Sequence, residues 1–117
     1  MQTNEIQIIH SLLMQVGGPI GYRDLPINFN GGDEFYKKWD IYVNRVLLDL
    51  GNLNEDESIF LVSTVEFILK KIGWELSTVT KYSEQEILEA VSNLKKELKN
   101  AKDGMKLNDY LPSELQK

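Results

Sequence analysis

The sequence predicts a mainly α-helical fold, a small bundle of about four helices that forms one domain over residues 1–117. In four separate segments, apolar residues recur three and four positions apart, the spacing that places them on one face of an α-helix. Residues that favour helix starts and helix ends stand at the boundaries of these segments. The chain has 117 residues, of which 42% are hydrophobic, so it is long enough to bury one core.

The first helix is expected near residues 4–16. Asn4 followed by Gln7 has the pattern of a capping box, in which a side chain at each position accepts a hydrogen bond from the backbone of the other. Two glycines and a proline at positions 17–19 end the helix. The apolar stripe that defines the helix consists of Ile6, Ile8, Ile9, Leu12, Leu13 and Val16.

Residues 17–33 form the longest irregular stretch, with five glycines and two prolines among several apolar residues. A disordered linker carries few apolar side chains, so we expect a long ordered loop that lies across the bundle. Loops of this length are uncommon in compact domains unless they have a function or contain structure of their own. This loop has room for a short extended piece near residues 25–29.

The second and third helices are expected near residues 33–50 and 54–72. Asp33 is a suitable N-cap for the second helix, and Glu34 suits the positive end of its dipole. Asn54 is the expected cap of the third helix and is followed by three acidic residues. The third helix is apolar on most sides, so we expect it to be the central element.

Residues 74–82 are rich in β-branched and aromatic residues, which favours either a short strand or an extended crossover. A strand needs a partner, and residues 25–29 are the candidate. The two segments therefore predict a minor two-stranded patch beside the helices.

The fourth helix is expected near residues 83–103, because Ser83 and Glu86 have the capping-box pattern. Its apolar residues alternate in steps of four and three, which is typical of a seam in a bundle or a coiled coil. This seam predicts either part of the core or the interface of a homodimer. The remaining residues, 104–117, form a tail that we expect to pack back as a short turn after Pro112. The seam consists of Ile87, Val91, Leu94, Leu98, Ala101 and Met105.

The chain is acidic, with 18 acidic and 13 basic residues, a net charge of −5 and a pI near 4.9. DNA-binding domains usually carry a basic excess, so this balance disfavours non-specific binding to nucleic acid. The absence of cysteine excludes disulfides, thiolate nucleophiles and cysteine-ligated metals. The single histidine, His10, excludes a site with two or three histidine ligands. We therefore expect no metal and no other cofactor.

The first residues lack the basic region of a secretory signal, and no run of about 18 apolar residues is present. A chain without cysteine also suits a reducing compartment. We therefore expect a cytoplasmic protein that does not enter a membrane.

The sequence contains no arrangement of residues that predicts catalysis. On its helix, His10 has no carboxylate or nucleophile facing it, so we expect it at the border of the core. The acidic residues 55–57 do not fit the spacing of an EF-hand loop. The glycines at 31–32 are not followed by the Lys-Ser or Lys-Thr pair of a P-loop. We expect a protein without enzymatic activity.

In size, acidity and helical content the chain resembles bacterial immunity proteins and phage-encoded inhibitors, although no motif accompanies the resemblance. The resemblance implies an interaction module that neutralises a basic toxin or a nucleic-acid enzyme. Acidic side chains would replace the phosphates of the nucleic acid, and opposite charges would speed association. The expected contact residues, at the starts of the second and third helices, are Asp33, Glu34, Tyr36, Glu55, Asp56 and Glu57.

An alternative function is that of a small regulatory or accessory protein that binds nucleic acid through the fourth helix. Four lysines follow one narrow strip of this helix, but no aromatic residues for base stacking stand among them. The same lysines also suit a structural role, in which they cover the edge of the seam and complement the C-terminus of the helix. The strip consists of Lys95, Lys99, Lys102 and Lys106.

Overall fold

A computed structural model describes residues 1–25, 32, 34–98 and 111–115. The described chain is mainly helical, as the sequence predicts, and is arranged as a small helical bundle. Its α-helices are α1 (Thr3–Leu13), α2 (Glu34–Leu48), α3 (Glu55–Ile72), α4 (Leu76–Thr80) and α5 (Glu84–Glu97). Single 3₁₀ turns occur at η1 (Tyr22–Asp24), η2 (Leu50–Asn52), η3 (Gly73–Glu75) and η5 (Ser113–Leu115).

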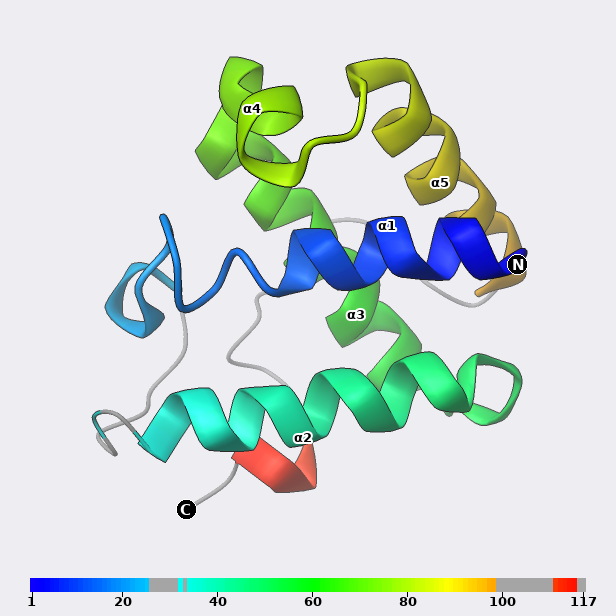
Figure 1. The fold of residues 1–117 in the computed structure, drawn as a ribbon. Coiled ribbons are helices and arrows are strands. Elements are labelled where there is room, and N and C mark those ends of the chain that lie inside the picture. Colours follow the sequence, from blue (N-terminus) through cyan, green and yellow to red (C-terminus); the bar gives the residue numbers. More distant parts are fainter. Residues whose placement is uncertain (26–31, 33, 99–110, 116–117) are drawn as a thin grey trace.

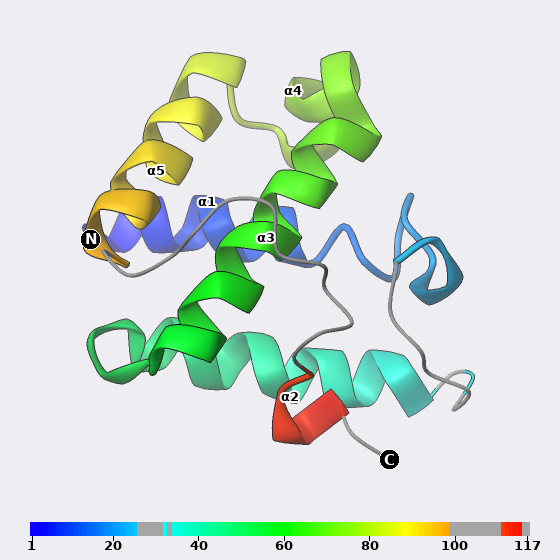
Figure 2. The ribbon, with the colours of Figure 1, turned by 180° about the vertical axis from the view of Figure 1, so that it is seen from behind.

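The helices form two layers around one core. In Figure 1, α1 and α2 lie side by side and run in opposite directions, while α3 crosses behind both of them. The view from behind in Figure 2 shows α3 in front, with α5 and α4 on either side of its upper half. Helix α1 contacts each of the other four α-helices, and the C-terminal turn η5 packs against α2. The two ends of the described chain are therefore both held by the bundle.

Three aromatic residues of α2 are the largest fully buried side chains among the described residues. Phe35, Trp39 and Tyr42 are fully buried and follow one another along α2, and Tyr42 meets the ring of Phe60 on α3. The indole Nε1 of Trp39 donates a hydrogen bond of 2.8 Å to the backbone carbonyl of Leu13. That carbonyl lies in the last turn of α1, where it has no partner within the helix. Trp39 therefore joins α1 to α2 by packing and by a buried hydrogen bond.

The predicted capping pair of α1 is wrong by two positions. The N-cap is Gln2 rather than Asn4, and the carboxylate of Glu5 accepts a hydrogen bond from the backbone N–H of Gln2. Several polar residues precede the first apolar stripe, so the local pattern fits more than one start. The helix also ends at Leu13, three residues before the predicted end, because the chain turns back there to pair Val16 with Ile20.

Residues 74–80 are helical and residues 81–82 form a bend, so the prediction of a strand or an extended crossover is wrong. Gly73 has φ 60° and turns the chain at the end of α3, after which η3 and α4 follow. Leu76 and Thr80, one turn apart, are both buried, and the Thr80 hydroxyl donates to the Leu76 carbonyl at 2.5 Å. Burial of one helical face thus outweighs the β propensity of the segment. Its expected strand partner, residues 26–29, lies outside the described residues.

The remaining helices follow the predicted pattern closely. The Asn54 side chain caps α3 by accepting from the backbone N–H of Glu57 at 2.8 Å. The Ser83 hydroxyl caps α5 by accepting from the N–H of Glu86 at 3.1 Å. Helix α2 ends at Leu48, two residues before the predicted end, and passes into η2. The proposed cap of α2, Asp33, lies outside the described residues.

The seam of α5 belongs to the core. Its four described members, Ile87, Val91, Leu94 and Leu98, are at most 5% exposed and pack inside the chain. Ala101 and Met105, and the predicted extension of the helix to residue 103, lie outside the described residues. Farther along, the chain forms one turn after Pro112, as predicted, and Leu115 on that turn is buried in the core.

Candidate functional site

Among the described residues, the start of α2 offers one acidic side chain to a partner, while the predicted contact residue Asp33 lies outside them. Glu34 is exposed, whereas Tyr36 is half-buried and its hydroxyl accepts a hydrogen bond of 3.3 Å from the backbone N–H of Tyr22. The ring of Tyr36 also packs edge-on against Tyr22 and Phe35. It closely approaches Gly17, whose φ of 110° few other residues adopt. Tyr36 thus orders the chain before α2, and only part of it is available for contact.

At the start of α3, the three acidic residues of the predicted patch have different environments. Glu55 and Asp56 are exposed. Glu57 is largely buried, and its carboxylate forms a 2.5 Å ion pair with the guanidinium of Arg45 on α2. Arg45 also binds the carboxylate of Glu114 on η5 through two nitrogens. Glu57 therefore serves to hold α2, α3 and the C-terminal turn together.

The ion pair between Arg45 and Glu114 stabilises the charged forms of both groups. Burial alone would raise the pKa of the Glu114 carboxyl, but the hydrogen bonds and the positive charge of Arg45 outweigh burial and hold that pKa below its ordinary value. The hydrogen bond to Glu114 in turn raises the pKa of Arg45, against the opposing effect of burial. Arg45 and Glu114 are therefore both charged near neutral pH.

The structure does not bring the two predicted acidic patches together. Glu34 begins α2, whereas Glu55 and Asp56 follow its far end, and Figure 1 shows these two ends on opposite sides of the molecule. A helix of 15 residues such as α2 is about 22 Å long. The patches are therefore separate surfaces rather than one site.

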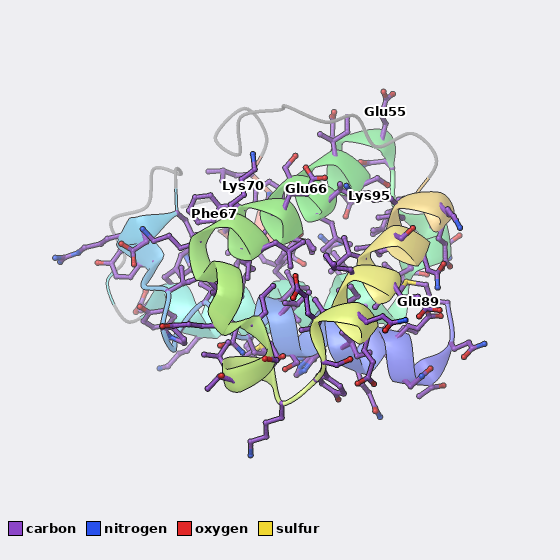
Figure 3. The ribbon with its side chains drawn as sticks, turned by 90° about the horizontal axis from the view of Figure 1, so that it is seen from above. Glu55, Glu66, Phe67, Lys70, Glu89 and Lys95 are labelled. Atoms are coloured by element: carbon purple, nitrogen blue, oxygen red, sulfur yellow. The ribbon has the colours of Figure 1, made fainter. Side chains whose placement is uncertain are left out.

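A third acidic surface, which we name the α1–α5 acidic cleft, was not predicted from the sequence. It is a hollow of about 160 Å³ between α1 and α5, with carboxylates of Glu5 from α1 and of Glu86 and Glu89 from α5. Glu86 and Glu89 are exposed, and Figure 3 shows Glu89 on the side of α5 that lies toward α1. None of the three carboxylates forms an ion pair with another described residue. The cleft is also lined by Gln2, Asn4, Ile8, Ala90 and Asn93.

Glu5 is fixed in this cleft by two donors. Its carboxylate accepts from the side-chain amide of Asn93 and, at 3.2 Å, from the backbone N–H of Gln2. The bond from Asn93 contributes most to lowering the pKa of Glu5. No local sequence pattern connects the acids of α5 with Glu5, which lies about 80 positions earlier in the chain. The cleft exists only once α1 and α5 pack together.

The described part of the lysine strip is engaged within the chain. Lys95 on α5 forms an ion pair with Glu66 on α3, and Figure 3 shows the two side chains pointing toward each other. They stand at the rim of a hollow of about 670 Å³ between α3 and α5. The other members, Lys99, Lys102 and Lys106, lie outside the described residues. The first lysine of the strip is thus partly neutralised by its neighbour.

A further hollow of about 640 Å³ lies beside α1, between α2 and Tyr82, and contains His10. His10 is exposed, and among the described residues that line this hollow there is no carboxylate to orient the imidazole for catalysis. Across residues 1–25, 32, 34–98 and 111–115, no group of three histidine, aspartate or glutamate side chains is close enough to hold a metal ion. In the same parts of the chain, every helix is too short or too polar to cross a membrane.

Comparison of the chain with protein-family models, with curated proteins and with solved structures gives no match. The function of the protein is therefore inferred from the surfaces described above.

Proposed function

We propose that this protein is a non-catalytic interaction module that binds and neutralises a basic protein, of the kind that immunity proteins and inhibitors bind. The observation that carries the proposal is the α1–α5 acidic cleft, where two helices present three carboxylates around one concave surface. Exposed acids at Glu34, Glu55 and Asp56 extend the negative surface to other parts of the molecule. A nuclease or another nucleic-acid enzyme is the partner class that fits, since its basic site already binds anionic phosphates.

The cleft suits the side chain of a lysine or an arginine. Its carboxylates supply acceptors for charge-assisted hydrogen bonds, which are about twice as strong as neutral ones. The bonds that Glu5 accepts from Asn93 and Gln2 hold one carboxylate in position before a partner arrives. With a net charge of −5, the chain would attract a basic partner over distances comparable to the Debye length, about 8–10 Å near physiological salt. Association is therefore expected to be fast and to weaken as salt is raised.

The experiment is an affinity purification from the native host at low and moderate salt, with mass spectrometry and nucleic-acid staining of the eluate. The test variant combines Glu86→Gln with Glu89→Lys, which retains a side chain able to cap α5. The control combines Glu55→Gln with Asp56→Lys, which changes the net charge equally at the start of another helix. Circular dichroism establishes that both variants fold.

We expect the wild type to retain one basic protein in stoichiometric amount at low salt and to lose it at moderate salt. The cleft variant is expected to lose that protein, while the control retains it. If only the control variant loses the basic protein, the contact lies at the start of α3 instead of in the cleft. If none of the three captures a basic protein at either salt concentration, the proposed function is wrong.

The alternative, a regulatory or accessory protein that binds nucleic acid, predicts a different eluate. Nucleic acid would then be retained without a stoichiometric protein, and exchange of Lys95 and Lys99 for glutamate would remove it. A cytoplasmic location belongs to both proposals and is inferred from a chain without cysteine, which suits a reducing compartment.

A further inference from the structure

The hollow beside α1 adjoins an unusually exposed leucine. Leu48, at the end of α2, is 88% exposed and lines the hollow together with Ile6 of α1 and Met14, which directly follows α1. Ile41, two turns earlier on the same face of α2, is 59% exposed. Leu48 thus projects directly beside an apolar hollow. We name the surface formed by Ile41, Leu48 and the other residues that line the hollow the α1–α2 face.

The described lining of the hollow in this face is also free of formal charge. The described residues that line it include no aspartate, glutamate, lysine or arginine, and their polar groups are those of His10, amides and hydroxyls. The chain as a whole carries a net charge of −5, so most orientations of two copies would bring like charges together. Contact through the α1–α2 face buries no like-charged pair within the hollow.

We propose that the α1–α2 face is the interface of a weak homodimer, in which Leu48 of each copy enters the hollow of the other. A two-fold axis makes such a contact reciprocal, because the same projection and the same concavity are used twice. The hollow of about 640 Å³ has room for a leucine side chain and for part of the helix that carries it. This interface differs from the seam of α5, which is occupied within the core.

The size of the face sets the strength of the dimer. A stable interface typically buries about 800 Å² on each partner, and smaller ones belong to transient complexes. We expect a contact confined to part of two short helices, of 11 and 15 residues, to bury less than that. We therefore expect dissociation constants on the order of tens to hundreds of micromolar, so that monomer and dimer exchange with concentration.

The dependence on salt concentration distinguishes the dimer from the binding of a basic partner. Raising the salt concentration screens the repulsion between two acidic copies and strengthens an apolar contact, so the dimer is expected to become tighter. Binding of a basic partner at the acidic cleft is expected to become weaker under the same change. The dimer is measured with the purified chain alone, so either proposal can fail without the other.

The test is sedimentation equilibrium of the purified protein from about 5 to 500 µM, a range chosen to bracket the expected dissociation constant. The variant is Leu48→Glu, and the control is Leu88→Glu, which places the same charge at a leucine 49% exposed on α5. Because two copies of Leu48 are lost from each dimer, we expect its dissociation constant to rise by at least about 100-fold. The control is expected to change it by less than about threefold.

Nuclear magnetic resonance during dilution supplies a second measurement. Amide signals of Ile6, His10 and Asn44 are expected to shift with concentration, while that of Leu88 stays constant. A monomer throughout the concentration range would overturn the inference and leave the hollow to a small molecule or to another protein. A dimer that Leu88→Glu weakens as much as Leu48→Glu would also overturn it, since the contact would then not be on this face.

Discussion

Arg45 joins three parts of the chain that are far apart in the sequence. From α2 it binds Glu57 at the start of α3 and Glu114 on the C-terminal turn. The two carboxylates are 15% and 11% exposed, so each depends on the guanidinium for much of its solvation. No sequence pattern connects these residues, and Glu57 looks equivalent to Glu55 and Asp56 until the fold is known.

Replacement of Arg45 by glutamine is expected to lower the free energy of unfolding by about 1–3 kcal/mol. The substitution leaves two largely buried carboxylates close together without a cation. Arg45 itself is 40% exposed, so water screens part of the loss, and we expect less than the roughly 3–5 kcal/mol that breaking a fully buried ion pair costs. Urea unfolding measures the change, with the exposed Lys37→Gln on the same helix as the control, expected within about 0.5 kcal/mol. Equal effects from both variants would contradict the assigned role of Arg45.

The Glu114 carboxyl is expected to make stability depend on pH. Its pKa is lower in the folded chain than in the unfolded one, so the folded state favours the ionised form. The contribution is therefore fully present above the unfolded pKa, about 4.3, and is lost as the pH falls through the folded pKa. We expect wild type to exceed Glu114→Gln in unfolding free energy above about pH 5, with the difference shrinking in more acidic solution. A pH-independent difference would show that Glu114 acts by packing alone.

At the scale of elements, hydrogen bonds between near neighbours are the features that the sequence predicts best. Asn54 and Ser83 cap α3 and α5 as expected, because both partners of each bond lie within three residues. The start of α1 was misplaced because its polar residues offer several equivalent caps. Residues 74–82 were misassigned for a different reason, since their helical form depends on burial of Leu76 and Thr80 against the rest of the bundle.

Gly73 makes the junction between α3 and α4 possible. Its φ of 60° and ψ of −126° lie in a region that other residues rarely adopt. A Cβ at this position would meet no atom within 4 Å, so strain rather than collision determines the cost of a side chain.

We expect Gly73→Ala to lower the free energy of unfolding by about 1–3 kcal/mol through backbone strain. Gly51→Ala is the matched control, because Gly51 also has open space around it but has no positive φ. Its substitution is expected to be neutral or to stabilise by up to about 1 kcal/mol, since alanine restricts the unfolded chain. Urea unfolding compares the two variants. A neutral Gly73→Ala would mean that the junction tolerates another conformation.

At the scale of the whole molecule, the distribution of charge could be predicted only in part. The net charge of −5 and the exposed acids at helix starts follow from the sequence. The α1–α5 acidic cleft does not, because it combines Glu5 with Glu86 and Glu89 across the bundle. Likewise, the exposure of Leu48 depends on where α1 and η5 lie against α2. Surfaces that form only when helices pack together therefore cannot be predicted from the pattern of single helices.

The C-terminal turn closes the bundle and is expected to unfold together with it. Leu115 is 1% exposed and belongs to the same core as the side chains of α1 and α2. We expect Leu115→Ala to lower the free energy of unfolding by about 2–5 kcal/mol, the usual range for truncating a buried leucine. Far-ultraviolet circular dichroism and tryptophan fluorescence, recorded during urea unfolding, should give coincident transitions in both proteins.

The slope of unfolding free energy against urea concentration distinguishes cooperative unfolding from a process in which the C-terminal turn detaches first. If the chain unfolds as one cooperative unit, Leu115→Ala moves the midpoint and leaves the slope unchanged, because the same surface is exposed on unfolding. If the turn leaves α2 in an earlier step, the slope falls and the two probes no longer coincide. Arg45→Gln provides an independent comparison, since it weakens the same contact between α2 and η5 through charge rather than through packing. Both variants should then shift the midpoint with the wild-type slope.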